Sequence, residues 1–168
     1  DLVTGFVSSV PYIFGIIGLL IIPRSSDRLN DRYGHLAVLY VLGAIGLFLS
    51  AWLSLPVAQL AALCLVAFAL FSCTAVFWTL PGRFFAGASA AAGIALINSV
   101  GNLGGYIGPF VIGALKEHTG NLASGLYFLS GVMVFGLILT GVVYRVLERK
   151  HVLPADQFAA SARGATRT

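Results

Sequence analysis

The sequence predicts an all-α membrane protein with five transmembrane helices, and three observations carry this prediction. Hydrophobic residues make up 58% of the 168 residues and charged residues only 10%, against about 45–50% and 25% in soluble domains. The mean hydropathy is +0.94. No charged side chain occurs in the four stretches 2–23, 36–82, 84–115 and 118–144. So few charges cannot cover a water-exposed surface, which excludes a soluble enzyme and a nucleic-acid-binding module despite the net charge of +4.

Each uncharged stretch is long enough to cross a bilayer, because a transmembrane helix needs about 20 apolar residues. The stretch 36–82 would be roughly 70 Å long as one helix, more than twice the hydrocarbon thickness. It must therefore turn back, and we expect the turn at Ser54-Leu55-Pro56, because proline ends one helix and can open the next. The five expected spans are 2–22, 36–54, 57–80, 88–115 and 123–144.

Lysine and arginine residues predict the orientation of these spans. Nine of the 10 lie in the first and third loops or after the last span, and only Lys116 lies on the opposite side. Cytoplasmic loops carry the excess of positive charge, so we expect these loops and the C-terminus to face the cytoplasm at a bacterial-type inner membrane. The chain divides into a transmembrane bundle at 1–150 and a disordered tail at 151–168.

Other features bound what the chain contains. The only methionine is Met133 and no signal peptide is recognisable, so we expect a fragment whose missing part lies upstream. Cys64 and Cys73 are nine positions apart, on opposite faces of a helix, so neither a disulfide nor a metal pair is expected. No span contains an ionisable Asp, Glu, Lys, Arg or His. We therefore expect no catalytic residues, no metal site and no cofactor.

The first cytoplasmic loop interleaves two acidic residues with three arginines over Pro23 to His35. We expect Asn30 and Gly34 to adopt left-handed turn geometry, and His35 to be solvated. Such a loop can hold two helix ends together by charge pairs and release them when the ends move. The alternative is a loop that only sets topology. The candidate gating residues are Asp27, Arg28, Asp31 and Arg32.

The fourth span carries the most informative polar pattern. Asn98 and Asn102 lie one helical turn apart and share a face, and Pro109 favours a kink. Two interleaved pairs of small residues permit close approach of another helix: Gly101/Gly105 and Gly104/Gly108. This pattern fits either a tightly packed helix whose amides bond to other helices, or a bending helix whose amides face a polar cavity.

Trp78 lies near the cytoplasmic end of the third span, with Thr74 one turn before it. Tryptophan at a span end is typical of the interfacial belt. If the span runs a few residues further, Trp78 is instead an interior side chain that can line a site. Tyr12, beside Pro11 in the first span, leaves the same two interpretations open.

Two motifs resemble those of the major facilitator superfamily. The first, Asp27-Arg28-Leu29-Asn30-Asp31-Arg32, is similar to the loop that these transporters carry between helices two and three and again between helices eight and nine. The second runs from Phe77-Trp78-Thr79-Leu80-Pro81 through Gly93–Gly105 to Gly108-Pro109. It resembles helices ten and eleven of the anion:cation symporter branch, which takes up organic acid anions such as sugar acids, tartrate and phthalate. The resemblance covers 1–147 and makes the five spans helices eight to twelve.

The resemblance implies a secondary active transporter that takes up an organic acid anion with protons by alternating access, two bundles rocking about a midplane site. In the family's sugar-acid carriers, a tryptophan on helix ten and an asparagine on helix eleven contact substrate, and these match Trp78 and Asn98. Asn102 and Thr74 join them as candidate substrate-binding residues. The family's charged substrate ligand and its titrating carboxylates lie in the N-terminal half. The loop departs from the family pattern at Pro23, where glycine is usual, and this weakens the expectation of gating there.

A second hypothesis is a non-transporting membrane anchor or subunit that holds a partner on its glycine-rich faces. A carrier predicts a homologous upstream half with a buried basic residue, whereas an anchor predicts a soluble domain or nothing upstream. A membrane-embedded enzyme needs ionisable residues within the spans, and the five predicted spans hold none. The expected partners are a small organic anion, the proton, the lipid bilayer and the missing N-terminal half, and no nucleic acid.

Overall fold

The computed structural model describes residues 2–84 and 88–149, which form helices joined by short connections. Five helices are long and apolar enough to cross a membrane, and one further helix is a single turn. This confirms the predicted all-α class and the number of spans. The tail predicted at 151–168 lies outside the described residues. The helices are α1 (Leu2–Leu29), α2 (Arg32–Trp52), α3 (Pro56–Phe77), α4 (Pro81–Phe84), α5 (Ala88–Thr119) and α6 (Ala123–Arg149).

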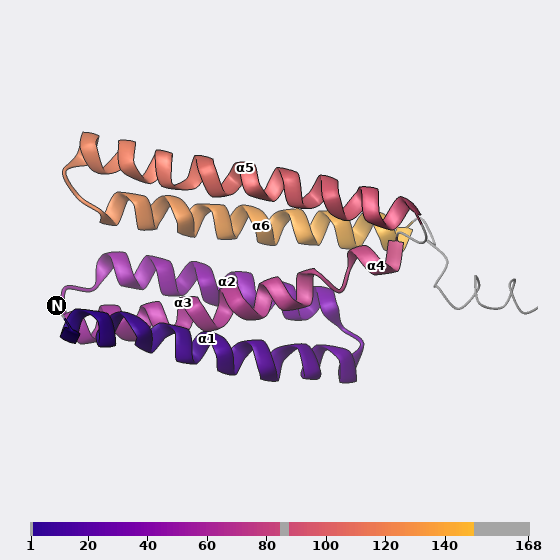
Figure 1. Ribbon diagram of the computed structural model, residues 1–168, viewed down its shortest axis with the longest axis horizontal. Helices are drawn as coiled ribbons and strands as arrows, with labels where there is room; N and C mark the ends of the chain where they lie inside the picture. Colours follow the sequence, from indigo (N-terminus) through magenta and orange to yellow (C-terminus); the bar gives the residue numbers. More distant parts are fainter. Residues whose placement is uncertain (1, 85–87, 150–168) are drawn as a thin grey trace, which may run out of the picture.

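The five long helices run up and down in alternation, and their spatial order differs from their chain order (Figure 1). α1 packs on α3, α3 on α2, α2 on α6 and α6 on α5. The α1–α2 connection, α4 and the C-terminal end of α6 lie at one end of the bundle, and the α2–α3 and α5–α6 connections lie at the opposite end. The arginine-rich end therefore collects the helix ends that carry Arg24, Arg28, Arg32, Arg83, Arg145 and Arg149.

The first two helices are longer at their shared end than the predicted spans 2–22 and 36–54. α1 continues through Pro23 to Leu29, and α2 begins at Arg32. The predicted loop from Pro23 to His35 is therefore wrong in extent, because a proline removes one helical hydrogen bond without having to end the helix. Only Asn30 and Asp31 connect the two helices.

Asn30 and Gly34 behave differently from each other. Asn30 has a φ of 50°, which confirms its left-handed geometry. Gly34 is helical, and the expected left-handed turn there is wrong. A Cβ on Gly34 would lie 2.1 Å from Asp31 Oδ2. The bare Cα therefore makes room for the Asp31 carboxylate, which accepts a hydrogen bond from the Gly34 N–H at 2.8 Å and caps α2.

The reversal expected at Ser54-Leu55-Pro56 is confirmed. α2 ends at Trp52, and Pro56 is the first residue of α3, where its missing N–H leaves no helical bond unmade. The Gln59 side chain donates a hydrogen bond to the Leu53 carbonyl at 2.7 Å and closes the turn. α3 then ends at Phe77, three residues before the predicted end of its span.

The core lies where α2 meets α3, around the buried side chains of Leu36, Leu39, Ala69 and Val76. Two glycines bring neighbouring helices against α3. A Cβ on Gly18 of α1 would lie 2.4 Å from Ser72 Oγ and 2.8 Å from the Phe68 carbonyl oxygen. A Cβ on Gly46 of α2 would lie 2.7 Å from a Val66 methyl group. α3 therefore packs between α1 and α2, and each of these helices approaches it closely at a glycine.

α6 packs on the other side of α2, and α5 packs on α6. Ser130 on α6 donates a hydrogen bond to the Ala44 carbonyl of α2 at 2.9 Å. α5 remains helical through Pro109. No described atom outside its own helix lies within 4 Å of a Cβ built at the four glycines of the small-residue pairs, so their close helix contact stays a prediction. Cys64 and Cys73 are free cysteines.

Candidate functional site

The two asparagines of the candidate site are exposed on α5. Ile112 is half-buried, and its side chain lies against Gly125 of α6. Ser99, next to Asn98, donates a hydrogen bond to the Ala95 carbonyl of its own helix at 2.8 Å. The two amides therefore form an exposed polar pair, one turn apart on α5.

Trp78 lies at the end of α3 rather than within it. Its backbone N–H donates a hydrogen bond to the Thr74 carbonyl at 3.2 Å. Its ring packs edge-on against the Phe77 ring, with the centroids 5.7 Å apart. The side chain is 41% exposed. Thr74 is exposed as well, and its hydroxyl donates to the Leu70 carbonyl at 2.9 Å. Both residues face outward near the arginine-rich end of the bundle.

The structure brings the candidate residues together in pairs. Thr74 lies in the last turn of α3 and Trp78 caps that helix, and Asn98 and Asn102 share one face of α5. These two helices pack against different neighbours. α3 makes extensive contacts with α1 and α2, whereas α5 contacts α6. A single site built from both pairs stays a prediction.

The candidate gating residues divide into different roles. Arg32 Nη2 lies 3.0 Å from Asp27 Oδ1, and this ion pair joins the last turn of α1 to the first turn of α2. Asp31 serves as the N-cap of α2. Arg28 lies on α1 and has no carboxylate partner among the described residues. The predicted charge pair between helix ends is present, and gating through it stays a prediction.

His35 links the same two helices, and the expectation that it is solvated is wrong. Its side chain is half-buried: Nε2 lies 3.2 Å from Ser25 Oγ on α1, and Nδ1 bonds to the Asp31 carbonyl. A carbonyl oxygen only accepts, so Nδ1 is the donor. The buried Ser26 hydroxyl donates to the same carbonyl at 3.3 Å. The sequence does contain a pattern that could have predicted this contact. It has two serines near the end of one helix and a histidine one turn into the next, but the charged residues around them draw attention to ion pairs instead.

Comparison with known proteins finds relatives that are named as transporters. The chain is 77% identical over 150 residues to a quinolone resistance transporter of Acinetobacter baumannii, a match that covers 89% of this chain and 35% of that protein. It is 40% identical over 145 residues to an Agrobacterium vitis protein named for tartrate transport, covering 86% and 34%. It is 34% identical over 133 residues to the inner membrane transport protein RhmT of Escherichia coli K12, covering 79% and 31%.

Over most of its length the chain is similar to proteins that are named as membrane transporters. This confirms the resemblance drawn from the two motifs and is consistent with a segment of a major facilitator transporter. The chain spans about a third of the length of these relatives. No protein-family profile and no solved structure matches it. The five apolar helices and the transporter relatives together make it part of a multi-pass membrane protein.

The two acidic residues at the α1–α2 connection, Asp27 and Asp31, are expected to differ in their effect on stability. Asp31→Ala should cost about 1 kcal/mol, because it removes the N-cap of α2. Asp27→Asn should cost less, because an exposed ion pair contributes about 0.2–1 kcal/mol. Asp31→Asn keeps a capping oxygen and should retain most of the stability. Thermal midpoints of the purified full-length variants check this order, and a larger loss for Asp27→Asn than for Asp31→Ala would contradict it.

Proposed function

We propose that the chain is the C-terminal part of a major facilitator carrier that moves an organic acid anion across the bacterial inner membrane by alternating access. The observation that carries this proposal is the exposed pair Asn98 and Asn102 on α5, in a chain similar to a protein named for tartrate transport. Amides donate and accept hydrogen bonds, so this face suits the hydroxyl and carboxyl oxygens of a polar acid. The Trp78 indole adds an apolar surface for packing.

The charged part of recognition is proposed to come from outside this chain. The regions 2–22, 36–54, 57–80, 88–115 and 123–144 contain no ionisable Asp, Glu, Lys, Arg or His, and such residues carry protons and bind charged substrates within membranes. The N-terminal half of the full-length protein would then bind the carboxylate and couple transport to protons. The arginine-rich end of the bundle would face the cytoplasm, as the positive-inside rule predicts.

Uptake into proteoliposomes tests this function. The full-length protein is reconstituted and offered radiolabelled tartrate, a sugar acid and an aromatic carboxylate, with and without an inward proton gradient. We expect accumulation of at least one acid, stimulated by the gradient and abolished by a protonophore. Accumulation that ignores the gradient would contradict proton coupling, and failure with every acid would contradict the substrate class.

A second substrate class is favoured by the relative that is 77% identical and named a quinolone resistance transporter. Quinolones are aromatic carboxylic acids, so the same indole and amides suit them. Expression of the full-length gene in a quinolone-susceptible strain should then raise the inhibitory concentration and lower cellular quinolone. Uptake of an organic acid with unchanged quinolone susceptibility favours the first function. A membrane anchor would show neither activity.

A further inference from the structure

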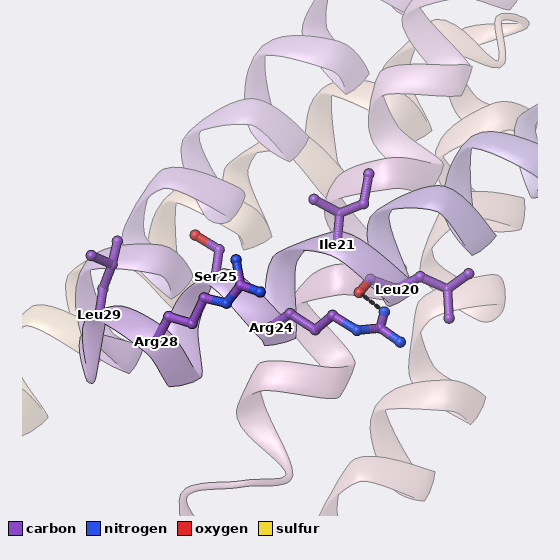
Figure 2. Close-up of a pocket in the computed structure, with 6 residues that line it drawn as sticks. All are labelled: Leu20, Ile21, Arg24, Ser25, Arg28 and Leu29. Carbon is purple, nitrogen blue, oxygen red and sulfur yellow. Dashed lines mark hydrogen bonds between the residues drawn. The ribbon is translucent and has the colours of Figure 1, made fainter.

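A hollow of about 410 Å³ lies on α1 (Figure 2), and none of the candidate substrate residues lines it. Its lining comes from the last three turns of α1, with leucine and isoleucine side chains on one part and two arginines on another. The lining residues are Leu20, Ile21, Arg24, Ser25, Arg28 and Leu29. Such a surface combines positive charge with apolar contact area.

Arg24 and Arg28 supply the charge of this hollow. They lie one turn apart on the same face of α1, and both are exposed. The ion pair at the end of α1 joins Asp27 to Arg32, so neither Arg24 nor Arg28 has a carboxylate partner among the described residues. Arg24 donates one hydrogen bond to the Leu20 carbonyl, and a guanidinium carries five N–H donors. Most of the donors in the hollow therefore remain available to an anion.

The position of the arginines along α1 places them at the membrane boundary. The uncharged stretch ends at Pro23, so Arg24 is the first charge beyond the apolar span. Arg28 lies about 6 Å further along the helix axis. Figure 2 shows both side chains directed back along α1, Arg28 toward Arg24 and Arg24 toward Leu20. A guanidinium directed toward the apolar region needs a neutralising anion there.

We propose that this hollow binds the headgroup of an anionic phospholipid. Arg24 and Arg28 would bind the phosphate oxygens, because guanidinium donors match phosphate geometry. Leu20 and Ile21 are 50% and 56% exposed and lie toward the membrane centre from the arginines, where they would contact the acyl chains. A free phosphate ion would leave this apolar part of the hollow uncovered, which is why the lipid is favoured.

Binding at this place also acts on the contact between α1 and α2. Ser25 lies between the two arginines in the sequence, and its hydroxyl bonds to His35 of α2. A lipid that holds the end of α1 therefore supports the same helix end that His35 and the Asp27–Arg32 pair secure. The proposal requires only that α1 crosses the membrane, so it stands apart from the transported substrate.

Lipid-dependent stability of the purified full-length protein tests the proposal. Delipidated protein in neutral detergent is titrated with phosphatidylglycerol or phosphatidylcholine, and the thermal midpoint and the bound lipid by native mass spectrometry are measured. We expect phosphatidylglycerol to bind and raise the midpoint. In the Arg24→Gln/Arg28→Gln variant its affinity should fall on the order of 30-fold. The matched control is Arg145→Gln, which removes an exposed arginine from α6 at the same end of the bundle and should bind like the wild type.

Other outcomes would overturn the proposal. An equal loss in Arg145→Gln would show unspecific attraction between the protein and charged lipid. Equal protection by inorganic phosphate or glycerol phosphate would make the hollow a site for a free anion. A third outcome has two parts: phosphatidylglycerol has no effect on the wild type, and the double variant has a lower thermal midpoint in detergent. It would show that an acidic segment elsewhere in the full-length protein pairs with the arginines. If the double variant does not fold, Arg28→Gln alone provides the same comparison.

Discussion

If the full-length protein transports an organic acid as proposed, replacing Asn98 with alanine is expected to lower its uptake efficiency about 10- to 100-fold, while its amount in the membrane stays unchanged. Asn98 is exposed on α5. In a substrate site its amide would bond an oxygen of the acid, and alanine would leave that oxygen without a partner in a desolvated cavity. Initial rates of labelled acid uptake over a range of concentrations measure the loss.

Ser99→Ala is the matched control for this experiment. Ser99 is the next residue and is also exposed, but its hydroxyl is already bonded to the Ala95 carbonyl of the same helix. Uptake by Ser99→Ala should therefore stay close to that of the wild type. Wild-type kinetics in Asn98→Ala would remove Asn98 from the site. Equal losses in both variants would indicate that α5 tolerates no change in this turn, and would equally contradict a specific role for the amide.

Gly18→Ala is expected to cause the largest loss of stability, about 1–3 kcal/mol from overpacking at the contact between α1 and α3. The added Cβ would lie 2.8 Å from the Phe68 carbonyl oxygen and 2.4 Å from Ser72 Oγ. The carbonyl belongs to the α3 backbone and cannot rotate away, so α1 must move outward. This loss exceeds the roughly 1 kcal/mol that alanine contributes over glycine in a helix.

Gly131→Ala on α6 separates packing from helix propensity. No described atom outside its own helix lies within 4 Å of a Cβ at Gly131, so the propensity gain should leave the thermal midpoint equal to or above that of the wild type. Fluorescence-detected size-exclusion chromatography of heated, detergent-solubilised protein measures both variants. A midpoint for Gly18→Ala equal to that of the wild type would contradict the close approach of α1 and α3.

Much of the fold is predictable from the sequence because the bilayer imposes a simple rule. A helix that crosses it must be apolar for about 20 residues, so four charge-free stretches, one of them long enough for two helices, indicate five spans. Pro56 marks the reversal within the longest stretch, and Asn30 marks a left-handed residue, because each has a strong backbone preference. The structure confirms both positions.

The roles of the loop residues are less predictable. The alternation of acids and arginines suggests several equivalent charge pairs, and it does not show that α1 continues through Pro23. That continuation places Asp27 on a helix facing Arg32 and leaves Asp31 as the cap of the next helix. The bond from His35 to Ser25 likewise exists only because the two helix ends meet. The pairing of Trp78 with Asn98 in one site stays a prediction, because their helices pack against different neighbours.

The sequence by itself determined that the described part of the chain has five helices long and apolar enough to cross a membrane. It also determined where the chain reverses and which end carries the positive charge. Only the tertiary structure decided which helices are neighbours. α3 is apolar on every side, so no stripe of hydrophobic residues indicates the faces that it presents to other helices. Its place between α1 and α2 depends on the close approach at Gly18 and Gly46. A glycine in the sequence of a helix does not show by itself that another helix approaches there. The contact is recognised only when the position of the opposing backbone is known.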